Sequence, residues 1–155
     1  MHLVPIKEHL SENIGICNHP DCQEIIEMTV AYYQKIGFTP PWIGYLVIHS
    51  EEIVGSGGFK GKPKNGVVEI AYGTFEKSRN QGIGSQICKL LVDLSLTSDP
   101  AVIITARTLP EHNFSTKILA KNNFKYIGIV HDPEDGDVWE WHFQSAFASL
   151  HTLSD

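Results

Sequence analysis

Hydrophobic side chains recur at helical spacing in three stretches of the chain, and each stretch predicts a helix with one buried face. The first runs from Asp21, where the sequence is typical of a helix N-terminus, to Gly37, a residue type that favours helix ends. The second begins near Ile83. The third is a short helix around Ile118 that closes at Asn123, because asparagine tolerates the left-handed conformation.

Runs of β-branched and aromatic residues between turn-forming segments predict strands. The predicted strands cover residues 3–6, 43–49, 53–59, 67–74, 101–106, 124–130 and 138–143. The continuous apolar run at 101–106 is typical of a strand buried on both faces. Strands and helices follow one another without a linker, so we expect a single α/β domain over residues 1–155, with a further short helix at 144–150.

Composition narrows the class of protein without deciding its function. The 155 residues are 42% hydrophobic, which is enough for one globular domain with a sizeable core. No run approaches the roughly 18 apolar residues of a membrane span, and no signal segment opens the chain, so we expect a cytoplasmic protein. The formal net charge of −6 argues against a nucleic-acid partner and mildly favours a cationic or amine substrate.

Two of the three cysteines lie close together, in the segment Cys17-x-His19-x-x-Cys22. This spacing invites a zinc site, but no fourth ligand with the usual spacing follows. Three cysteines cannot all pair with one another, so a secreted disulfide framework is not expected. We therefore expect free thiols around a turn at Pro20 and no metal site.

The segment most suggestive of function joins the predicted strand 67–74 to the second helix. It reads Arg79, Asn80, Gln81, Gly82, Ile83, Gly84 and Ser85. Backbone N–H groups at a helix start have no partner within the helix, and the helix dipole makes that end positive. Glycines let a phosphate approach these groups and Arg79 adds positive charge, so we predict a pyrophosphate site with Gly84 against the ligand.

Two common phosphate-binding motifs do not fit this segment. The third glycine of a dinucleotide fingerprint is replaced by isoleucine, and the Gly-Lys-Ser/Thr of a P-loop is absent. The acidic residue that binds ribose about 20 residues beyond such glycines is also missing, which disfavours a nucleotide-binding module. A plain helix-start turn remains the alternative to a ligand site.

Four sequence blocks occur in order along the chain. They are Gly55-Ser56-Gly57-Gly58-Phe59, Val68-Glu69-Ile70-Ala71-Tyr72, Arg79-x-x-Gly82-x-Gly84, and the segment 109–124, which begins Leu109-Pro110-Glu111-His112-Asn113-Phe114-Ser115. Together they resemble the GNAT superfamily of N-acetyltransferases, and within it the branch of ribosomal-protein N-acetyltransferases. The resemblance implies a single-domain α/β fold with a mixed, mostly antiparallel central sheet flanked by helices, whose motif-bearing core spans about residues 43–143.

The resemblance also implies a cofactor and its contacts. Acetyl-CoA would be the co-substrate, with its pantetheine arm on main-chain groups around Thr74 at a bulged strand end and its pyrophosphate cradled by residues 79–85. Asn113 and Ser115 would lie near the pantetheine and the sulfur. The chain departs from the family pattern at His112, which stands where relatives often have the asparagine.

The implied chemistry is direct attack of a neutral amine on the thioester, which needs a proton acceptor, an oxyanion donor and correct orientation. Some relatives use a glutamate on the strand at 101–106 and a tyrosine near Ala120, and both are missing here. Glu69 is the remaining candidate base, because a carboxylate in an apolar strand is costly unless paired or useful. The alternatives are a salt-bridged or outward-facing Glu69, and His112 acting through a water. Ser115 could protonate or solvate the leaving thiolate, or simply cap its helix.

We therefore expect an N-acetyltransferase that moves the acetyl group of acetyl-CoA to a primary amine through a ternary complex, without a metal. The acceptor would be a small molecule or a peptide, and no nucleic-acid or membrane partner is expected. A monomer and a homodimer are both compatible with the sequence. A non-catalytic acyl-CoA-binding or sensing domain remains the alternative, because the usual base and acid are missing.

Overall fold

The fold is a seven-stranded sheet with helices on both faces, as seen in the computed structural model, which describes residues 1–145. Its α-helices are α1 (Pro20–Ile36), α2 (Ile83–Ser98) and α3 (Phe114–Lys121). Its strands are β1 (His2–Pro5), β2 (Gly44–His49), β3 (Glu52–Phe59), β4 (Val67–Thr74), β5 (Ile103–Thr108), β6 (Phe124–Asp132) and β7 (Gly136–Phe143). Two short 3-10 turns, η1 (Leu10–Asn13) and η2 (Glu76–Ser78), precede α1 and α2.

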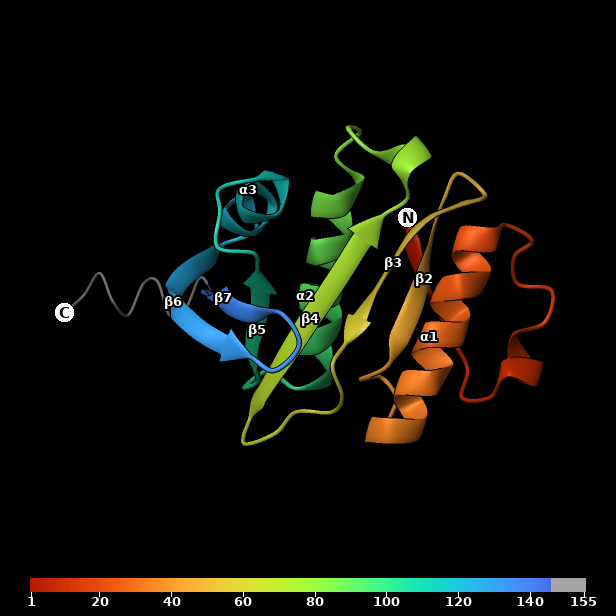
Figure 1. Ribbon diagram of the computed structural model, residues 1–155, viewed down its shortest axis with the longest axis horizontal. Helices are drawn as coiled ribbons and strands as arrows, with labels where there is room; N and C mark the ends of the chain where they lie inside the picture. Colours follow the sequence, from red (N-terminus) through yellow and green to blue (C-terminus); the bar gives the residue numbers. More distant parts are fainter. Residues whose placement is uncertain (146–155) are drawn as a thin grey trace.

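The strands are arranged in the order β1-β2-β3-β4-β5-β7-β6. Every neighbouring pair is antiparallel except β4 and β5, which are parallel, so the prediction of a mixed, mostly antiparallel sheet is confirmed. The parallel register ends at Glu69↔Thr105, whereas β4 continues to pair with β3 as far as Gly55↔Thr74. Beyond Glu69, β4 and β5 diverge and the sheet opens at its middle (Figure 1).

Helices α1 and α2 cover opposite faces of the sheet. A side chain placed at Gly44 of β2 would meet Thr29 of α1, and one placed at Gly57 of β3 would meet Ile87 and Leu91 of α2. Helix α3 packs beside α2 and against β6. Figure 1 shows that α1 lies over β2 and β3. On the same face of the sheet, no helix of the described residues covers β4 and β5.

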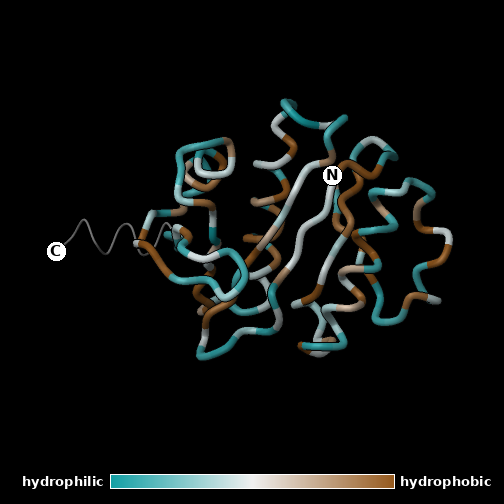
Figure 2. The backbone as a smooth tube through the Cα atoms, in the orientation of Figure 1, coloured by the Kyte–Doolittle hydropathy of each residue, from teal (hydrophilic) through white to brown (hydrophobic). Residues whose placement is uncertain are grey.

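The hydrophobic core lies between the sheet and these helices. Its fully buried side chains include Leu46, Ile70, Ile87, Leu91 and Ile104. Figure 2 shows hydrophobic segments along the central strands and α2, and a hydrophilic turn between β6 and β7. The prediction of a strand buried on both faces at 101–106 is correct for Val102 and residues 104–106 but wrong for Ala101 and Ile103, which are exposed; Ile103 is 47% exposed.

Helix α1 begins earlier than the sequence pattern indicated. His19, rather than Asp21, is the N-cap: its Nδ1 accepts a hydrogen bond from the Asp21 N–H at 3.2 Å. Pro20 occupies the first helical position, where the missing N–H costs nothing. The predicted end at Gly37 is confirmed, since this glycine has a φ of 94° and its N–H donates to the Tyr33 carbonyl.

The cysteine prediction is wrong for two of the three thiols. Cys17 and Cys22 form a disulfide, with their Cα atoms 6.4 Å apart, and only Cys88 is free and buried. An odd number of cysteines means that the thiols cannot all form disulfides, but it does not exclude one local disulfide. Such a disulfide needs only that a cysteine in a loop lie next to a cysteine in the first turn of a helix, as Cys17 and Cys22 do. Within residues 1–145, no group of three or more His, Cys, Asp or Glu side chains could hold a metal ion.

Two further expectations concern helices. No helix in the described part of the chain is long and apolar enough to cross a membrane. The short helix expected at 144–150 falls almost entirely outside the described residues.

One buried tyrosine joins three elements of the N-terminal half. The Tyr33 hydroxyl of α1 donates to the Ile6 carbonyl at 2.8 Å and accepts from the Gly44 N–H at 2.9 Å. These bonds tie α1 to the ends of β1 and β2. Burial raises the pKa of Tyr33 from 10.0 to about 12, so the hydroxyl keeps its proton throughout the physiological range.

We predict that Tyr33→Phe lowers the free energy of unfolding by about 1–3 kcal/mol, because it leaves a buried carbonyl and a buried N–H without their partner. Urea denaturation at pH 7 measures the change. The difference from wild type should narrow between pH 10 and 12, because the unfolded tyrosine ionises before the folded one. Tyr32→Phe, on the exposed side of the same helix, is the matched control, and an equal loss there would contradict the assignment.

Candidate active site

The divergence of β4 and β5 directs backbone groups of β4 into the opening. The Glu69 carbonyl accepts from the Lys60 N–H at 2.9 Å, so odd-numbered β4 residues point their backbone groups toward β3. The even-numbered Tyr72 and Thr74 therefore point theirs to the side from which β5 has departed. The register with β3 is unbroken along this stretch, so the bulge expected at the strand end is wrong, and divergence alone makes the opening.

The wide end of the opening leads to the start of α2. Arg79, Asn80 and Gln81 follow η2 and are exposed. Gly82 is the N-cap of α2 with a left-handed φ of 75°, no side chain caps the helix, and a Cβ at Gly82 would meet nothing within 4 Å. The N–H groups of the first turn thus have the arrangement that a pyrophosphate site requires.

Gly84 and Ser85 contact α3 instead of the open side. A Cβ at Gly84 would lie 2.9 Å from Ile118 Cδ1 and 3.4 Å from Thr74 Oγ1. Ser85 Oγ accepts a hydrogen bond from Asn122 Nδ2 at 3.1 Å. The close approach of α2 and α3 therefore accounts for glycine at position 84, and a side chain there would strike Ile118 before any ligand.

The start of α3 is capped by Asn113. Its Oδ1 accepts from the Thr116 N–H at 3.2 Å, and Thr116 Oγ1 accepts from the Asn113 N–H at 2.9 Å. The capping role considered for Ser115 is therefore wrong, and the exposed Ser115 hydroxyl is not used by the cap. One turn later Ile118 reaches toward α2, so Ser115 lies on the side of α3 that faces α2.

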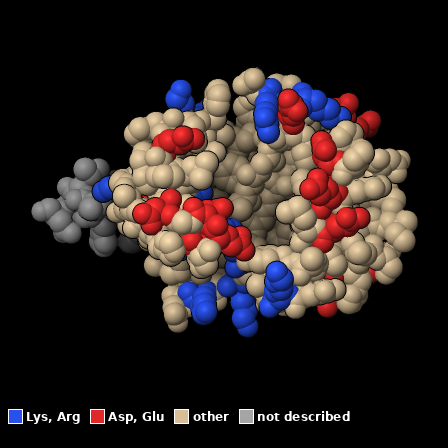
Figure 3. Space-filling model, viewed as in Figure 1, with Lys and Arg blue, Asp and Glu red and all other residues tan. Residues whose placement is uncertain are grey.

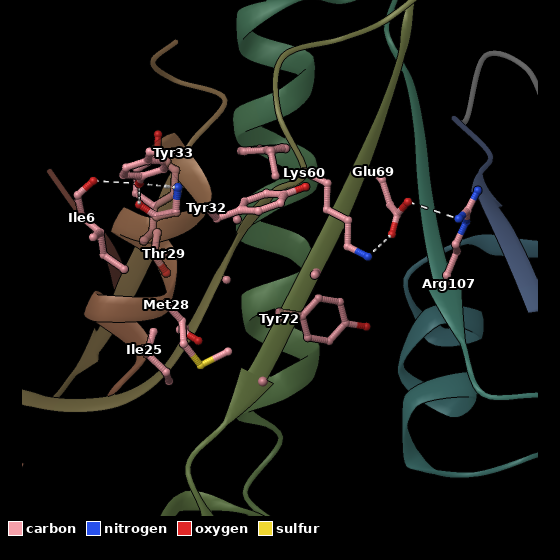
Figure 4. A pocket seen from close by; sticks show the side chains of 18 of the residues that line it. Ile6, Ile25, Met28, Thr29, Tyr32, Tyr33, Lys60, Glu69, Tyr72 and Arg107 are labelled. Atoms are coloured by element: carbon pink, nitrogen blue, oxygen red, sulfur yellow. Dashed lines mark hydrogen bonds and ion pairs between the residues drawn. The ribbon is translucent and has the colours of Figure 1, made fainter. Parts of the chain in front are cut away.

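On the α1 side of the sheet, the opening borders a pocket of about 770 Å³. Met28 and Tyr32 of α1 form one wall, Pro133 and Glu134 of the β6–β7 turn form another, and β3 and β4 supply the floor. Figure 4 shows the α1 wall with Met28 and Tyr32, and the floor with Lys60, Glu69 and Arg107. Figure 3 shows the hollow at the centre of this face, with acidic side chains on two sides and basic side chains at both ends.

Charged side chains meet at the floor of this pocket. Glu69 Oε2 lies 2.9 Å from Lys60 Nζ, and Glu69 Oε1 lies 3.6 Å from Arg107 Nε. Arg107 also donates to Asp132 at 2.9 Å and lies 3.6 Å from Glu140. Glu69 is therefore salt-bridged and also lines the pocket, with its side chain 18% exposed, at the point where β4 and β5 part.

These contacts keep the cluster charged. Burial lowers the pKa of Lys60, but the hydrogen bond and charge of Glu69 outweigh burial and raise it. Burial also lowers the pKa of Arg107, but the hydrogen bond that Arg107 donates to Asp132 and the charges of Glu69 and Glu140 outweigh burial and raise it. Two backbone N–H groups of the β6–β7 turn, together with Arg107, lower the pKa of Asp132 to about 2.

A tyrosine lies at the side of the opening. Figure 4 shows Tyr72 projecting from β4 toward the β5 side. Burial, with Cys88 of α2 as a neighbour, raises the pKa of Tyr72 far above its ordinary value, and burial raises the pKa of Cys88 to about 11. Both groups are neutral near pH 7, because the raised pKa of each keeps its proton bound.

The structure brings most residues of the predicted site to one opening. Thr74 and residues 79–85 lie at its wide end, and Glu69 lies where it begins. His112, considered as a base through a water, packs edge-to-face on Trp139 with ring centroids 5.0 Å apart and does not line the pocket.

Sequence reasoning missed Lys60, Arg107 and Tyr72. For Arg107 a signal was present, because the argument that singled out Glu69, a charge in an otherwise apolar strand, applies equally to an arginine directly after the apolar run at 101–106. For Lys60 and Tyr72 the sequence contains no comparable signal, since each is an ordinary residue at its position until the strands are paired.

Comparison with known proteins identifies the family. The sequence profile of the acetyltransferase (GNAT) domain matches residues 5–125. An uncharacterized N-acetyltransferase of Bacillus subtilis (strain 168), YjdG, is 35% identical over 122 residues, which cover 77% of this chain and 73% of the relative.

Solved structures share the fold. An apo form of RimL, a ribosomal L7/L12 alpha-N-protein acetyltransferase, superposes with a TM-score of 0.63 at 16% identity over 90% of each chain. The aminoglycoside acetyltransferase AAC(6')-Ib in complex with coenzyme A and kanamycin superposes with a TM-score of 0.59 at 22% identity, covering 72% of this chain and 70% of that one. With the profile match and the curated relative, the conclusion is that this chain belongs to the GNAT acetyltransferase family and is an acetyl-CoA-dependent acetyltransferase.

Proposed function

We propose that the protein transfers the acetyl group of acetyl-CoA to a primary amine at the point where β4 and β5 part. The coenzyme would enter from the start of α2, and the amine from the pocket on the α1 side. The observation that carries this proposal is the position of Glu69, which is the last β4 residue paired with β5 and also lines that pocket. Glu69 thus lies where the opening between the strands meets the pocket.

The coenzyme would lie along the open side of β4. Its pyrophosphate would bind the N–H groups of residues 83–85, with Arg79 nearby. Its pantetheine arm would pair with the backbone of Tyr72 and Thr74. The five steps of extended strand from Thr74 to Glu69 span ~17 Å, so a ligand anchored at α2 must be long and narrow to reach the base. Relatives crystallised with coenzyme A support this choice of ligand.

In the proposed reaction, Glu69 takes a proton from the ammonium form of the acceptor, and the neutral amine attacks the carbonyl carbon of the thioester. The new C–N bond pushes the carbonyl electron pair onto oxygen, where a backbone N–H of the opening stabilises it. The carbonyl bond then re-forms as the C–S bond breaks and its electron pair leaves with sulfur. The proton released from nitrogen restores the thiol of coenzyme A, and Glu69 passes the proton it took to water.

Two hydroxyls would support the leaving group. Tyr72 holds its proton too firmly to be an acid, so its role would be to donate a hydrogen bond to the developing charge. Ser115, whose hydroxyl the α3 cap does not use, would solvate the thiolate from the other side of the opening. Neither hydroxyl needs to transfer a proton for the reaction to balance.

The acceptor class follows from the charge around the pocket. Acidic side chains border the hollow on two sides, which favours a cationic amine over a neutral or anionic one (Figure 3). Among the structural relatives, one forms a complex with kanamycin and another modifies the N-terminal serine of ribosomal protein L7/L12. Small polyamines, aminoglycosides and peptide N-termini are therefore the acceptors to compare.

A non-catalytic acyl-CoA-binding or sensing domain is the second candidate. The observation that favours it is the 2.9 Å contact between Lys60 and Glu69, which gives the carboxylate a structural role that needs no proton transfer. In that case the pocket would serve as an entrance or a partner surface, and coenzyme would bind without turnover.

We predict that acetyl-CoA raises the melting temperature by mass action while NAD and ATP do much less, and that an amine then releases free coenzyme A. The panel is kanamycin, spermidine, lysine and a peptide beginning with serine, followed by a thiol assay. Stabilisation by acetyl-CoA without release of thiol would support the sensing domain instead. Equal stabilisation by all three ligands would contradict the coenzyme site.

For the start of α2, we predict that Gly82→Asn weakens coenzyme A binding about tenfold, equivalent to about 1.4 kcal/mol, while the protein stays folded. Asparagine tolerates the left-handed conformation, and its side chain would intrude on the approach to the helix N-terminus. Gly84→Ala is the contrasting variant: it should lower the melting temperature, because Ile118 must move. Calorimetric titration of Gly82→Asn with unchanged affinity would remove this turn from the site.

For the base, we predict that Glu69→Gln keeps coenzyme affinity but lowers turnover about 100-fold below pH ~8. The amide preserves the shape of the carboxylate but cannot take a proton. Rates should converge toward wild type at higher pH, as the amine, with a pKa of roughly 10, loses its proton unaided. Glu134→Gln, on the pocket wall, is the charge-matched control. A loss that is equal at every pH would show that Glu69 orients or folds the site.

A further inference from the structure

Arg107 connects three carboxylates that come from three different strands. Its Nη1 donates a hydrogen bond to Asp132 Oδ2 at 2.9 Å. Its Nε lies 3.6 Å from Glu69 Oε1 and 3.6 Å from Glu140 Oε1. The side chain is 28% exposed and lines the same pocket as Glu69. In the part of the chain that the structure describes, no other side chain contacts all three of these carboxylates.

The two oxygens of Glu69 are held differently. Oε2 lies 2.9 Å from Lys60 Nζ, within hydrogen-bond distance. Oε1 lies beyond that distance from Arg107 Nε, which is buried and makes no hydrogen bond within the described residues. Lys60 therefore fixes one oxygen, whereas Arg107 attracts the other without occupying its lone pairs. Oε1 is the oxygen that can accept a proton.

We propose that Arg107 is a positioning residue for acetyl transfer: it holds the Glu69 carboxylate by charge where β4 and β5 part, and leaves Oε1 free for the proton of the acceptor amine. This proposal rests on the proposed role of Glu69 as the base. It assigns to Arg107 an effect on the ionisation and orientation of Glu69, and no contact with the reacting atoms.

The contact with Asp132 gives the same residue a second effect. Asp132 accepts N–H bonds from Glu134 at 2.9 Å and from Asp135 at 3.2 Å, and so closes the β6–β7 turn that walls the pocket. Through Asp132, Arg107 anchors that wall to the floor. A planar guanidinium can reach the wall and the floor together in fixed directions, whereas a lysine offers one point charge.

The groups around Glu69 come from every element packed about it. They are Lys60, Tyr32, Arg107, Asp132, Glu140 and His142, which lies 3.3 Å from Glu140 Oε2. With His142 neutral, the cationic side chains of Lys60 and Arg107 face the three carboxylates, so the cluster has one excess negative charge. Removing Arg107 raises that excess, and a carboxylate in such surroundings loses its charge at a higher pH.

The test is the pH dependence of turnover with the panel amine that wild type acetylates fastest, measured from pH 6 to 10. Arg107→Gln should move the acid limb of kcat to higher pH by about one unit, with coenzyme A affinity unchanged. Arg107→Lys retains the charge, so the acid limb should return toward its wild-type position while kcat stays lower. Lys89→Gln, which removes the same charge from an exposed site on α2, is the matched control.

A second variant acts in the opposite direction and keeps the anchor to Asp132. Glu140→Gln removes a neighbouring negative charge and leaves Arg107 Nε to Glu69 alone, so the acid limb should move to lower pH. If Arg107→Gln does not fold, the shift of the acid limb in Glu140→Gln tests the proposal by itself. The pH midpoint of the Glu69 carboxyl carbon in ¹³C NMR gives the same comparison without an acceptor and should move in the same two directions.

The outcomes separate this proposal from the proposed function. If Glu69→Gln slows turnover at low pH but the two variants leave the acid limb and the NMR midpoint in place, Arg107 has no positioning role. If Arg107→Gln lowers the rate equally at every pH and also in the Glu69→Gln background, its role is structural only, and the proposal is wrong. If Glu69→Gln has no effect on turnover, the base assignment fails, and with it the catalytic meaning of Arg107.

Discussion

The parting of β4 and β5 is the constraint on which the rest of the site depends. Backbone N–H and C=O groups need partners, so a central strand that loses its neighbour has unpaired groups that water or a ligand must satisfy. In this protein the loss begins directly after Glu69↔Thr105, while the pairing of β4 with β3 continues. The fold thus keeps β4 rigid along one edge and offers the other edge for binding.

The two ends of the opening are built from different elements and offer different chemical groups. At the wide end, α2 begins with a glycine-led turn that presents N–H groups and that no side chain caps, and α3 packs so closely that a side chain at position 84 would displace Ile118. At the narrow end no helix of residues 1–145 covers the α1 side, and a charged pocket reaches the sheet. A long anionic ligand and a cationic one can therefore approach the same point from different sides.

Electrostatics at the narrow end is balanced by side chains from five neighbouring segments. Isolated carboxylates in an apolar strand are unfavourable, and Lys60 and Arg107 remove most of that cost for Glu69. Arg107 is shared with Asp132 and Glu140, so that no single carboxylate neutralises it. Such shared pairing keeps the groups charged while one oxygen of Glu69 has no hydrogen bond within the described residues, a combination suited to proton transfer.

Much of the fold could be predicted because its signals are local. Helical spacing located α1 and α2, β-branched runs located the strands, and Gly82 with its neighbours marked the junction of β4 and α2. Glu69 could be singled out because a charge inside an apolar strand is conspicuous in one dimension. The caps at His19 and Asn113 were misjudged because several neighbouring residues could serve, and only the backbone path decides among them.

The sequence by itself determined the family, the order of the elements and the candidate phosphate turn, because each depends on residues that are close together in the chain. Only the tertiary structure decided the partners of Glu69, the disulfide between Cys17 and Cys22, and the reason for Gly84. Lys60, Arg107, Asp132 and Glu140 meet Glu69 because of strand order and register. Those depend on how the whole chain minimises its exposed apolar surface, and no short segment records them.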